Sequence, residues 1–108
     1  MDLNGEIKIF FDKDYAQLKF TETNISFSID SVMVPYKHRG KGIGSKLIKR
    51  MIMWADSAQK DVFTSARAIG ICNEEKVQRL VRFYEQFGFC AYKHGVTAVY
   101  MKRTSQNF

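Results

Sequence analysis

The sequence has few residues that would cross-link or break the chain. Among its 108 residues it has one proline, Pro35, and two cysteines, Cys72 and Cys90. The cysteines show neither metal-ligand spacing nor a disulfide framework, so we interpret them as ordinary thiols. No apolar run approaches the ~20 residues of a membrane-spanning helix, and the first residues, MDLNGEIK, lack a signal-peptide pattern. We therefore expect a cytoplasmic protein.

Apolar and basic residues are, by contrast, abundant. Hydrophobic residues make up 45% of the chain and aromatic residues 14%, which excludes a mainly disordered state. The length fits a single domain over residues 1–108. The formal net charge is +6, and the Lys and Arg residues concentrate between Lys37 and Lys60. This charge favours an anionic partner, either a polyanion or one heavily phosphorylated cofactor.

The spacing of apolar residues predicts an alternation of strands and helices. Short apolar runs separated by polar turns are typical of strands, and apolar residues at i, i+4 steps from Ile43 to Ala55 indicate a helix. A second helix has Asn73 as a candidate cap and Gly88 as its stop. The expected elements are strands 6–11, 15–20 and 25–34, a helix 42–58, a strand 61–69, a helix from 73 to Gly88, and strands 89–93 and 96–103, which turn at His94 and Gly95. We therefore expect an α/β fold of order β-β-β-α-β-α-β-β with a mixed sheet.

The third expected strand breaks its own alternation. Its apolar residues alternate over residues 25–29 and then fall out of step at Val32. A β-bulge near residues 30–31 produces such a slip, because one extra residue exchanges the two faces of the strand. The alternative is that the second half of the strand is buried on both faces, which Met33 would also fit.

A glycine-rich segment follows that strand. Residues 39–45 read RGKGIGS and precede the expected helix. The first turn of a helix presents unpaired N–H groups, and glycine lets the backbone approach a phosphate. The spacing is wrong for a P-loop, because the sixth residue from Gly40 is Ser45, and it is wrong for the G-x-G-x-x-G dinucleotide loop. It fits the pattern R-x-x-G-x-G, with Arg39, Gly42 and Gly44.

Together with a second motif, this loop resembles the GNAT superfamily of N-acetyltransferases. The segment SVMVPYKHRGKGIGSKLI, residues 31–48, is similar to the pyrophosphate-binding motif of that family. The segment RFYEQFGF, residues 82–89, is similar to its other signature, an aromatic–Tyr pair followed after a short spacer by Gly-Phe. The resemblance covers about residues 24–92 and implies a small, minimal GNAT-like member. It implies transfer of an acetyl group from acetyl-CoA (coenzyme A), with no metal, to a primary amine by direct attack in a ternary complex.

The resemblance also implies roles for individual residues. Tyr84 would protonate the departing CoA thiolate, and the alternative is a tyrosine that only packs on the core. Asp30, beside the expected thioester site, is the candidate general base, with Glu75 and Glu85 as further candidates. The alternative is a solvated Asp30 and no dedicated base. The pantetheine arm would pair with the open strand edge and the pyrophosphate would bind the loop, so the expected cofactor-binding residues are Val32, Met33, Val34, Arg39, Gly40, Lys41, Gly42, Ile43, Gly44, Ser45 and Asn73.

Two features depart from the family pattern. Many members carry an Asn about seven residues before the Tyr, where this sequence has Val77, so that helix capping is an alternative role for Asn73. The usual pair of helices before the main motif is replaced by strands, which leaves the acceptor side open or completed by another subunit. An open acceptor side favours a protein lysine or a chain N-terminus over a small amine. The C-terminal strands also offer a way for two copies to pair as a homodimer.

Two other functions stay compatible with the sequence. A degenerate member would bind acyl-CoA and act as a regulatory or interaction module with weak catalysis. A nucleic-acid-binding domain would use the basic cluster, but the sequence contains no recognised nucleic-acid motif and its aromatic residues fall mostly at core-like positions. We expect neither a membrane nor nucleic acid as the partner.

Overall fold

The computed structural model describes residues 2–67 and 74–106. These residues form a six-stranded mixed sheet of order β1-β2-β3-β4-β6-β5 and two α-helices. The predicted order of elements is confirmed, and strands rather than helices precede the glycine-rich loop. The elements are β1 (Leu3–Phe10), β2 (Tyr15–Glu22), β3 (Ser26–Met33), a short 3-10 turn η1 (Tyr36–His38), α1 (Ile43–Ser57), β4 (Asp61–Arg67), α2 (Glu74–Glu85), β5 (Cys90–His94) and β6 (Ala98–Arg103).

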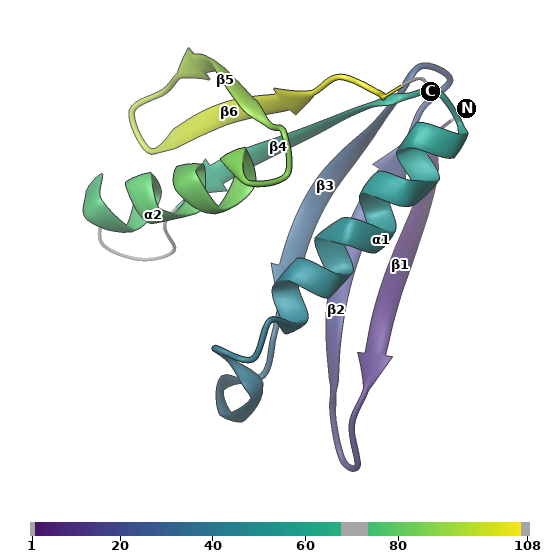
Figure 1. Cartoon of the computed structure of the whole chain (residues 1–108), viewed down its shortest axis with the longest axis vertical. Coiled ribbons are helices and arrows are strands. Elements are labelled where there is room, and N and C mark those ends of the chain that lie inside the picture. Colours follow the sequence, from purple (N-terminus) through teal and green to yellow (C-terminus); the bar gives the residue numbers. More distant parts are fainter. Residues whose placement is uncertain (1, 68–73, 107–108) are drawn as a thin grey trace.

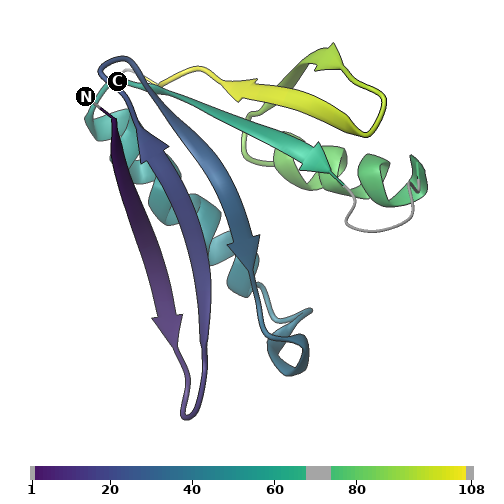
Figure 2. The same cartoon turned by 180° about the vertical axis from the view of Figure 1, so that it is seen from behind.

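Both α-helices cover the same face of the sheet (Figure 1, Figure 2). In α1 the buried side chains recur every three or four residues, which gives the helix one apolar side that packs on the first three strands. They are Ile43, Leu47, Ile48, Met51 and Ala55. In α2 the buried residues are Val77 and Tyr84, and this helix packs on β4, β5 and β6. Among the described residues, no helix covers the opposite face.

The sheet splits between β3 and β4. These strands are parallel and pair only at Ser26–Asp61, Phe27–Val62 and Ser28–Phe63. Beyond these pairs the strands diverge, so that β1, β2 and β3 form one arm of a V and β4, β5 and β6 form the other (Figure 1). The backbone of β3 beyond Ser28 therefore borders the opening without pairing with β4.

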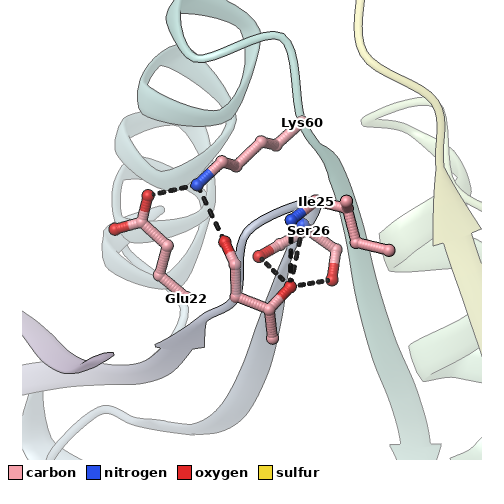
Figure 3. Close-up of polar contacts among 5 residues, drawn as sticks. Glu22, Ile25, Ser26 and Lys60 are labelled. Atoms are coloured by element: carbon pink, nitrogen blue, oxygen red, sulfur yellow. Dashed lines mark hydrogen bonds and ion pairs between the residues drawn. The ribbon is translucent and has the colours of Figure 1, made fainter. Parts of the chain in front are cut away.

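Polar contacts stabilise the closed end of the V (Figure 3). The Lys60 ammonium, just before β4, donates to Glu22 Oε2 at 2.6 Å and to Thr23 O at 2.8 Å. The Thr23 hydroxyl oxygen in turn accepts the backbone N–H of Ser26 at 3.0 Å. These bonds attach the turn between β2 and β3 to the start of β4, which fixes the point from which the two arms diverge.

The predicted β-bulge lies in β3. Ile29 and Ser31 face consecutive residues of β2, so that Asp30 is the extra residue. Ile29 is buried before the bulge, and Val32 packs against the same core after it. Burial of both faces is excluded, because Met33 is 50% exposed. The broken alternation therefore has a bulge as its cause.

At the C-terminal hairpin the structure corrects the sequence prediction. The turn covers residues 95–97 rather than His94 and Gly95, because Gly95 N donates to Ala98 O at 2.8 Å and β6 begins only at Ala98. Cys90 is an exposed, free thiol on the edge strand β5. The predicted end of the fourth strand at 68–69, Cys72 and the cap at Asn73 lie outside the described residues.

A largely buried ion pair joins α1 to β6. The Arg103 side chain is 9% exposed and donates from Nη1 to Asp56 Oδ1 at 2.7 Å. Its Nε donates to Phe87 O, also at 2.7 Å. The hydrogen bond from Arg103 holds the pKa of Asp56 below its usual value of 3.8, although burial opposes this effect. Arg103 therefore ties three segments that are distant in the sequence.

Removal of this arginine should destabilise the protein in a pH-dependent way. We expect Arg103→Met to lower the free energy of unfolding at neutral pH by about 2 kcal/mol, because the Phe87 carbonyl loses its Arg103 donor and the Asp56 carboxylate keeps, among the described residues, only the backbone N–H of Gln106. The folded-state pKa of Asp56 is depressed, so its stabilising contribution is present above the usual value of 3.8 and is lost as the pH falls through the folded-state pKa. In urea titrations the difference in the free energy of unfolding from wild type should therefore shrink below about pH 4.

Lys102→Met, which removes a more exposed ion pair with Asp61, is the control and should cost less than about 0.5 kcal/mol. A difference that does not change with pH would contradict this account.

Candidate functional site

The loop between β3 and α1 contains two residues in the left-handed region. Gly40 has a φ of 78° and Gly42 a φ of 77°. A Cβ at either position would meet nothing within 4 Å, so the need for glycine there is conformational rather than steric. Gly44 differs, because it lies in the first turn of α1 and a Cβ there would come 4.0 Å from Phe83 Cζ.

This conformation leaves a set of N–H donors at the start of α1. The first helical hydrogen bond is donated by Lys46 N to Gly42 O at 3.1 Å, and Gly42 supplies no side-chain cap. The N–H groups of Ile43, Gly44 and Ser45 therefore have no acceptor within the helix. These donors and the positive end of the helix dipole together suit an anion such as a pyrophosphate.

A pocket of about 250 Å³ lies at these donors. Its wall includes the loop glycines, Val34, His38, Arg39 and Phe83. Arg39 Nε donates to Val34 O at 3.0 Å, and its Cζ lies 5.7 Å from the centre of the Tyr36 ring. Within the described part of the chain, its two Nη groups have no hydrogen-bond or ion-pair partner. His38 Nε2 lies 3.2 Å from Asp14 Oδ1, which ties the pocket to the turn between β1 and β2. The guanidinium of Arg39 is thus held beside the pocket with donors available to an anion.

A larger cavity of about 920 Å³ occupies the opening of the V. Residues 28–32 of β3 form one wall, and residues of β4 and α2 form the other. Phe83 lines both cavities, so that the loop pocket and this groove adjoin. An extended, peptide-like ligand in the groove would meet the backbone of β3 where it does not pair with β4.

The groove brings Asp30 and Tyr84 together on its opposite walls. Asp30 is exposed, and its Oδ2 accepts a hydrogen bond from Thr21 Oγ1 at 2.7 Å. Tyr84 is 7% exposed, and burial raises the pKa of its phenol above 10.0, against a weaker opposing effect of its hydrogen bond with the Thr64 side chain. Such a phenol stays protonated at neutral pH and serves as a proton donor, while an exposed carboxylate serves as an acceptor.

The structure distributes the other predicted cofactor residues between the two cavities and the surface. Val32 lines the groove. Met33 is half-exposed and lines neither cavity, and Lys41 is exposed outside the pocket wall. Asn73 lies outside the described residues. The members of the predicted set that line the loop pocket are Val34, Arg39, Gly40, Gly42, Ile43, Gly44 and Ser45.

The two further candidate bases do not line the groove. Glu75 lies in the first turn of α2, where its carboxylate is 3.2 Å from Arg79 Nη2. Glu85 is exposed at the end of the same helix. Of the three carboxylates predicted as bases, only Asp30 lies in the wall of the groove.

Sequence reasoning missed several residues of the groove. Thr64, whose side chain forms a hydrogen bond with Tyr84, alternates along β4 with the buried residues Val62 and Ala66. A polar residue on the apolar side of an expected strand is a signal that could have identified it. The cations Arg67, Lys76 and Arg79 also line the groove. They come from β4 and α2, and no local pattern reveals that these two elements share a wall.

The described residues do not form a metal centre or a membrane span. Within residues 2–67 and 74–106, no group of three or more His, Cys, Asp or Glu side chains could hold a metal ion. No helix in these ranges is long and apolar enough to cross a membrane. The groups that the two cavities offer a ligand are backbone donors, hydroxyls, cations and Asp30.

The loop donors and the adjoining groove are suited to a phosphorylated ligand with an extended arm at a split sheet. A family model described as an acetyltransferase (GNAT) domain matches residues 5–91. The chain therefore belongs to the GNAT acetyltransferase family, and the resemblance of its two motifs is confirmed. No significant match is found among curated proteins.

Solved structures share this fold. The anti-CRISPR protein AcrVA5 matches with 22% identity and a TM-score of 0.64, over 93% of this chain and 99% of that chain. The ribosomal-protein-S18-alanine N-acetyltransferase from Escherichia coli matches with 13% identity and a TM-score of 0.77, over 97% of this chain and 72% of that one. An aminoglycoside 6′-N-acetyltransferase complexed with coenzyme A matches with 10% identity and a TM-score of 0.70, over 94% and 72%. The mixed α/β architecture is thus that of the GNAT fold.

Proposed function

We propose that this protein is an N-acetyltransferase that uses acetyl-CoA to acetylate a primary amine, with residues 1–108 acting as one domain. The observation that carries the proposal is that an anion-binding loop and a groove containing a proton donor and a carboxylate adjoin at Phe83. Acetyl-CoA would supply an activated thioester, and its CoA part leaves as a thiolate. The N–H groups of residues 43–45 and the Arg39 guanidinium suit its pyrophosphate, and the β3 backbone beyond Ser28 suits its peptide-like arm.

Tyr84 is the proposed general acid. Its burial raises the pKa of the phenol, so the proton is present at neutral pH and can be transferred to a thiolate in the groove. The hydrogen bond with the side chain of Thr64, on β4, orients the phenol. The tyrosine therefore packs on the core and also lines the groove, so the two alternatives considered from the sequence are compatible.

Asp30 is the proposed acceptor of the proton that the amine loses. In support, Asp30 is the extra residue of the bulge and lines the groove, and Thr21 Oγ1 donates a hydrogen bond to its Oδ2. The same bulge leaves backbone groups of β3 unpaired at this level, and an N–H there is suited to stabilise negative charge on a thioester oxygen.

The proposed acceptor is a protein lysine or a chain N-terminus in a direct-attack, ternary-complex reaction. From residue 2 to the end of β3 the chain forms strands, and none of these residues covers the groove with a helix. Proteins of this fold include one named for a protein acceptor and one named for an aminoglycoside. The fold alone therefore does not decide between a protein acceptor and a small-molecule acceptor. A groove that residues 2–33 do not cover with a helix favours the larger acceptor.

Calorimetric titration with acetyl-CoA tests the first step. We expect a dissociation constant of tens of micromolar or lower, about −6 kcal/mol or more favourable. Arg39→Gln should weaken binding by about tenfold, because it removes a charge-assisted contact to the pyrophosphate. Lys13→Gln, in the turn between β1 and β2, is the matched control and should bind like wild type. No binding at these concentrations would refute the proposal, and tight binding without CoA release over a broad amine panel would assign the chain to a binding module.

A further inference from the structure

The helix-free face of the sheet carries a cluster of aromatic and basic side chains on β4, β6 and β5. Val62, Thr64 and Ala66 are buried on the helix side, so the alternate residues Phe63, Ser65 and Arg67 belong to the other face. The register places Phe63 opposite Lys102 and Ser65 opposite Tyr100. We call this surface the aromatic–basic face, and define it by Phe63, Arg67, Tyr92, Lys93, Tyr100 and Lys102.

The members of the aromatic–basic face contact one another across the strands. The Phe63 and Tyr92 rings meet edge to face, with centroids 6.0 Å apart. Lys102 Nζ lies 5.6 Å from the centre of the Phe63 ring, and Lys93 Nζ lies 5.7 Å from that of Tyr100. Tyr92 is 57% exposed. The result is a surface with one exposed ring, Tyr92, beside two half-buried rings, Phe63 and Tyr100, over which the lysine ammoniums lie.

The charge of this face is positive. Its cations are Arg67, Lys93 and Lys102. On the same side of the described strands β4, β5 and β6 lies one carboxylate, that of Asp61, whose Oδ2 is 3.3 Å from Lys102 Nζ. Asp61 also accepts the backbone N–H of Ser105 at 2.9 Å. Within residues 2–67 and 74–106, Arg67 and Lys93 have no carboxylate partner on this face, in a chain whose formal net charge is +6.

The aromatic–basic face is continuous with the groove. Ser65 and Arg67 project to this face and also line the groove wall. Asp30 lines the same groove from β3. A molecule lying on the face therefore reaches, at Arg67, the cavity that contains Asp30 and Tyr84.

We propose that the aromatic–basic face docks an acidic segment of the acceptor protein, so that a lysine or N-terminal amine of that segment enters the groove at Arg67. This inference rests on the proposed function and adds the chemistry of its partner. Carboxylates of the segment pair with Arg67 and Lys93, and its apolar side chains pack on the exposed Tyr92 ring. Single-stranded nucleic acid fits less well, because base stacking needs a free ring face and lysine ammoniums lie over Phe63 and Tyr100.

Fluorescence anisotropy with labelled peptides tests the inference without any acetyl transfer. The probes are a short Glu- and Phe-containing peptide with one lysine, a peptide of the same length with Gln in place of Glu, and an oligothymidylate of matched charge. We expect the acidic peptide to bind about tenfold more tightly than the neutral one at low salt, and the difference to fall as salt is added. Equal binding of the two peptides would overturn the inference, as would tighter binding of the oligothymidylate than of the acidic peptide.

A matched pair of charge reversals locates the site. Lys93→Glu should weaken binding of the acidic peptide about three- to tenfold, whereas Lys49→Glu, an exposed position on α1, should change it less than about twofold. Equal losses in the two variants would show that net charge rather than this face is responsible. Both variants should bind acetyl-CoA like wild type in calorimetry. Failure of the wild type to bind acetyl-CoA would instead refute the proposed function, and peptide docking is measured independently of it.

Discussion

The Tyr84→Phe variant should transfer acetyl groups about 100- to 1,000-fold more slowly than wild type while it binds acetyl-CoA with unchanged affinity. This effect lies within the roughly 10²- to 10⁴-fold that a positioned general acid contributes, and the lost hydroxyl is the group that would protonate the thiolate. The ring itself stays, so the packing of Tyr84 against Phe89 and the core is preserved. Turnover measured by release of CoA thiol, beside calorimetry with acetyl-CoA, separates the two quantities.

The pH dependence of the same variant gives an independent check. Burial raises the pKa of Tyr84 above 10.0, so the phenol of the wild-type protein stays protonated throughout the neutral range. Deprotonation of this phenol should lower the rate only at more alkaline pH. That alkaline decrease should be absent from Tyr84→Phe. Tyr15→Phe removes a hydroxyl from the β1–β2 hairpin, outside both cavities, and serves as the control. Equal losses of turnover and cofactor affinity in Tyr84→Phe would argue for a structural role alone.

The second large effect is expected at the loop, where Gly42→Ala should weaken acetyl-CoA binding at least about tenfold. The φ of 77° costs a residue with a Cβ roughly 1–2 kcal/mol, although the Cβ itself would meet no neighbour within 4 Å. The loop then relaxes toward negative φ and turns its N–H groups away from the pocket. Charge-assisted hydrogen bonds of about 1.5–3 kcal/mol each are lost in this way.

Two substitutions separate conformation from other effects at the loop. Gly42→Asn should bind acetyl-CoA more tightly than Gly42→Ala, because asparagine tolerates the left-handed region. Gly44→Ala should leave thermal stability unchanged or raise it, because that position is helical and a Cβ there makes ordinary contact with Phe83 at 4.0 Å. If Gly42→Ala and Gly42→Asn bound equally, backbone strain would not be the cause.

Local patterns predicted those parts of the molecule that depend on neighbours in sequence. The i, i+4 spacing from Ile43 to Ala55 predicted α1, because a helix brings such residues onto one side. The slip of alternation in the third strand predicted the bulge at Asp30, since the period of a strand is two. The order of elements and the resemblance of the family motifs followed from the same short-range information.

Contacts between distant segments were not predictable in this way. The divergence of β3 from β4 depends on where the ladder between them stops, and no local pattern shows that it stops at Ser28 and Phe63. The pairing of Arg103 with Asp56 joins residues 47 positions apart, and neither residue shows it locally. The C-terminal turn was misplaced because Gly95 favoured a turn at His94–Gly95, whereas the structure forms the turn over residues 95–97.

A ligand that pairs with β3 beyond the short β3–β4 ladder would become a structural component of the sheet. An edge in the middle of a sheet must satisfy its N–H and C=O groups with water until another extended chain takes their place. A ligand arm seated along β3 would bridge the two arms of the V beyond the Ser28–Phe63 pair, where β3 and β4 do not pair with each other. Binding of a ligand in the groove would therefore be coupled to the relative motion of the two arms of the V. An acceptor that docks on β4, β6 and β5 would then meet a more rigid surface when the ligand is bound.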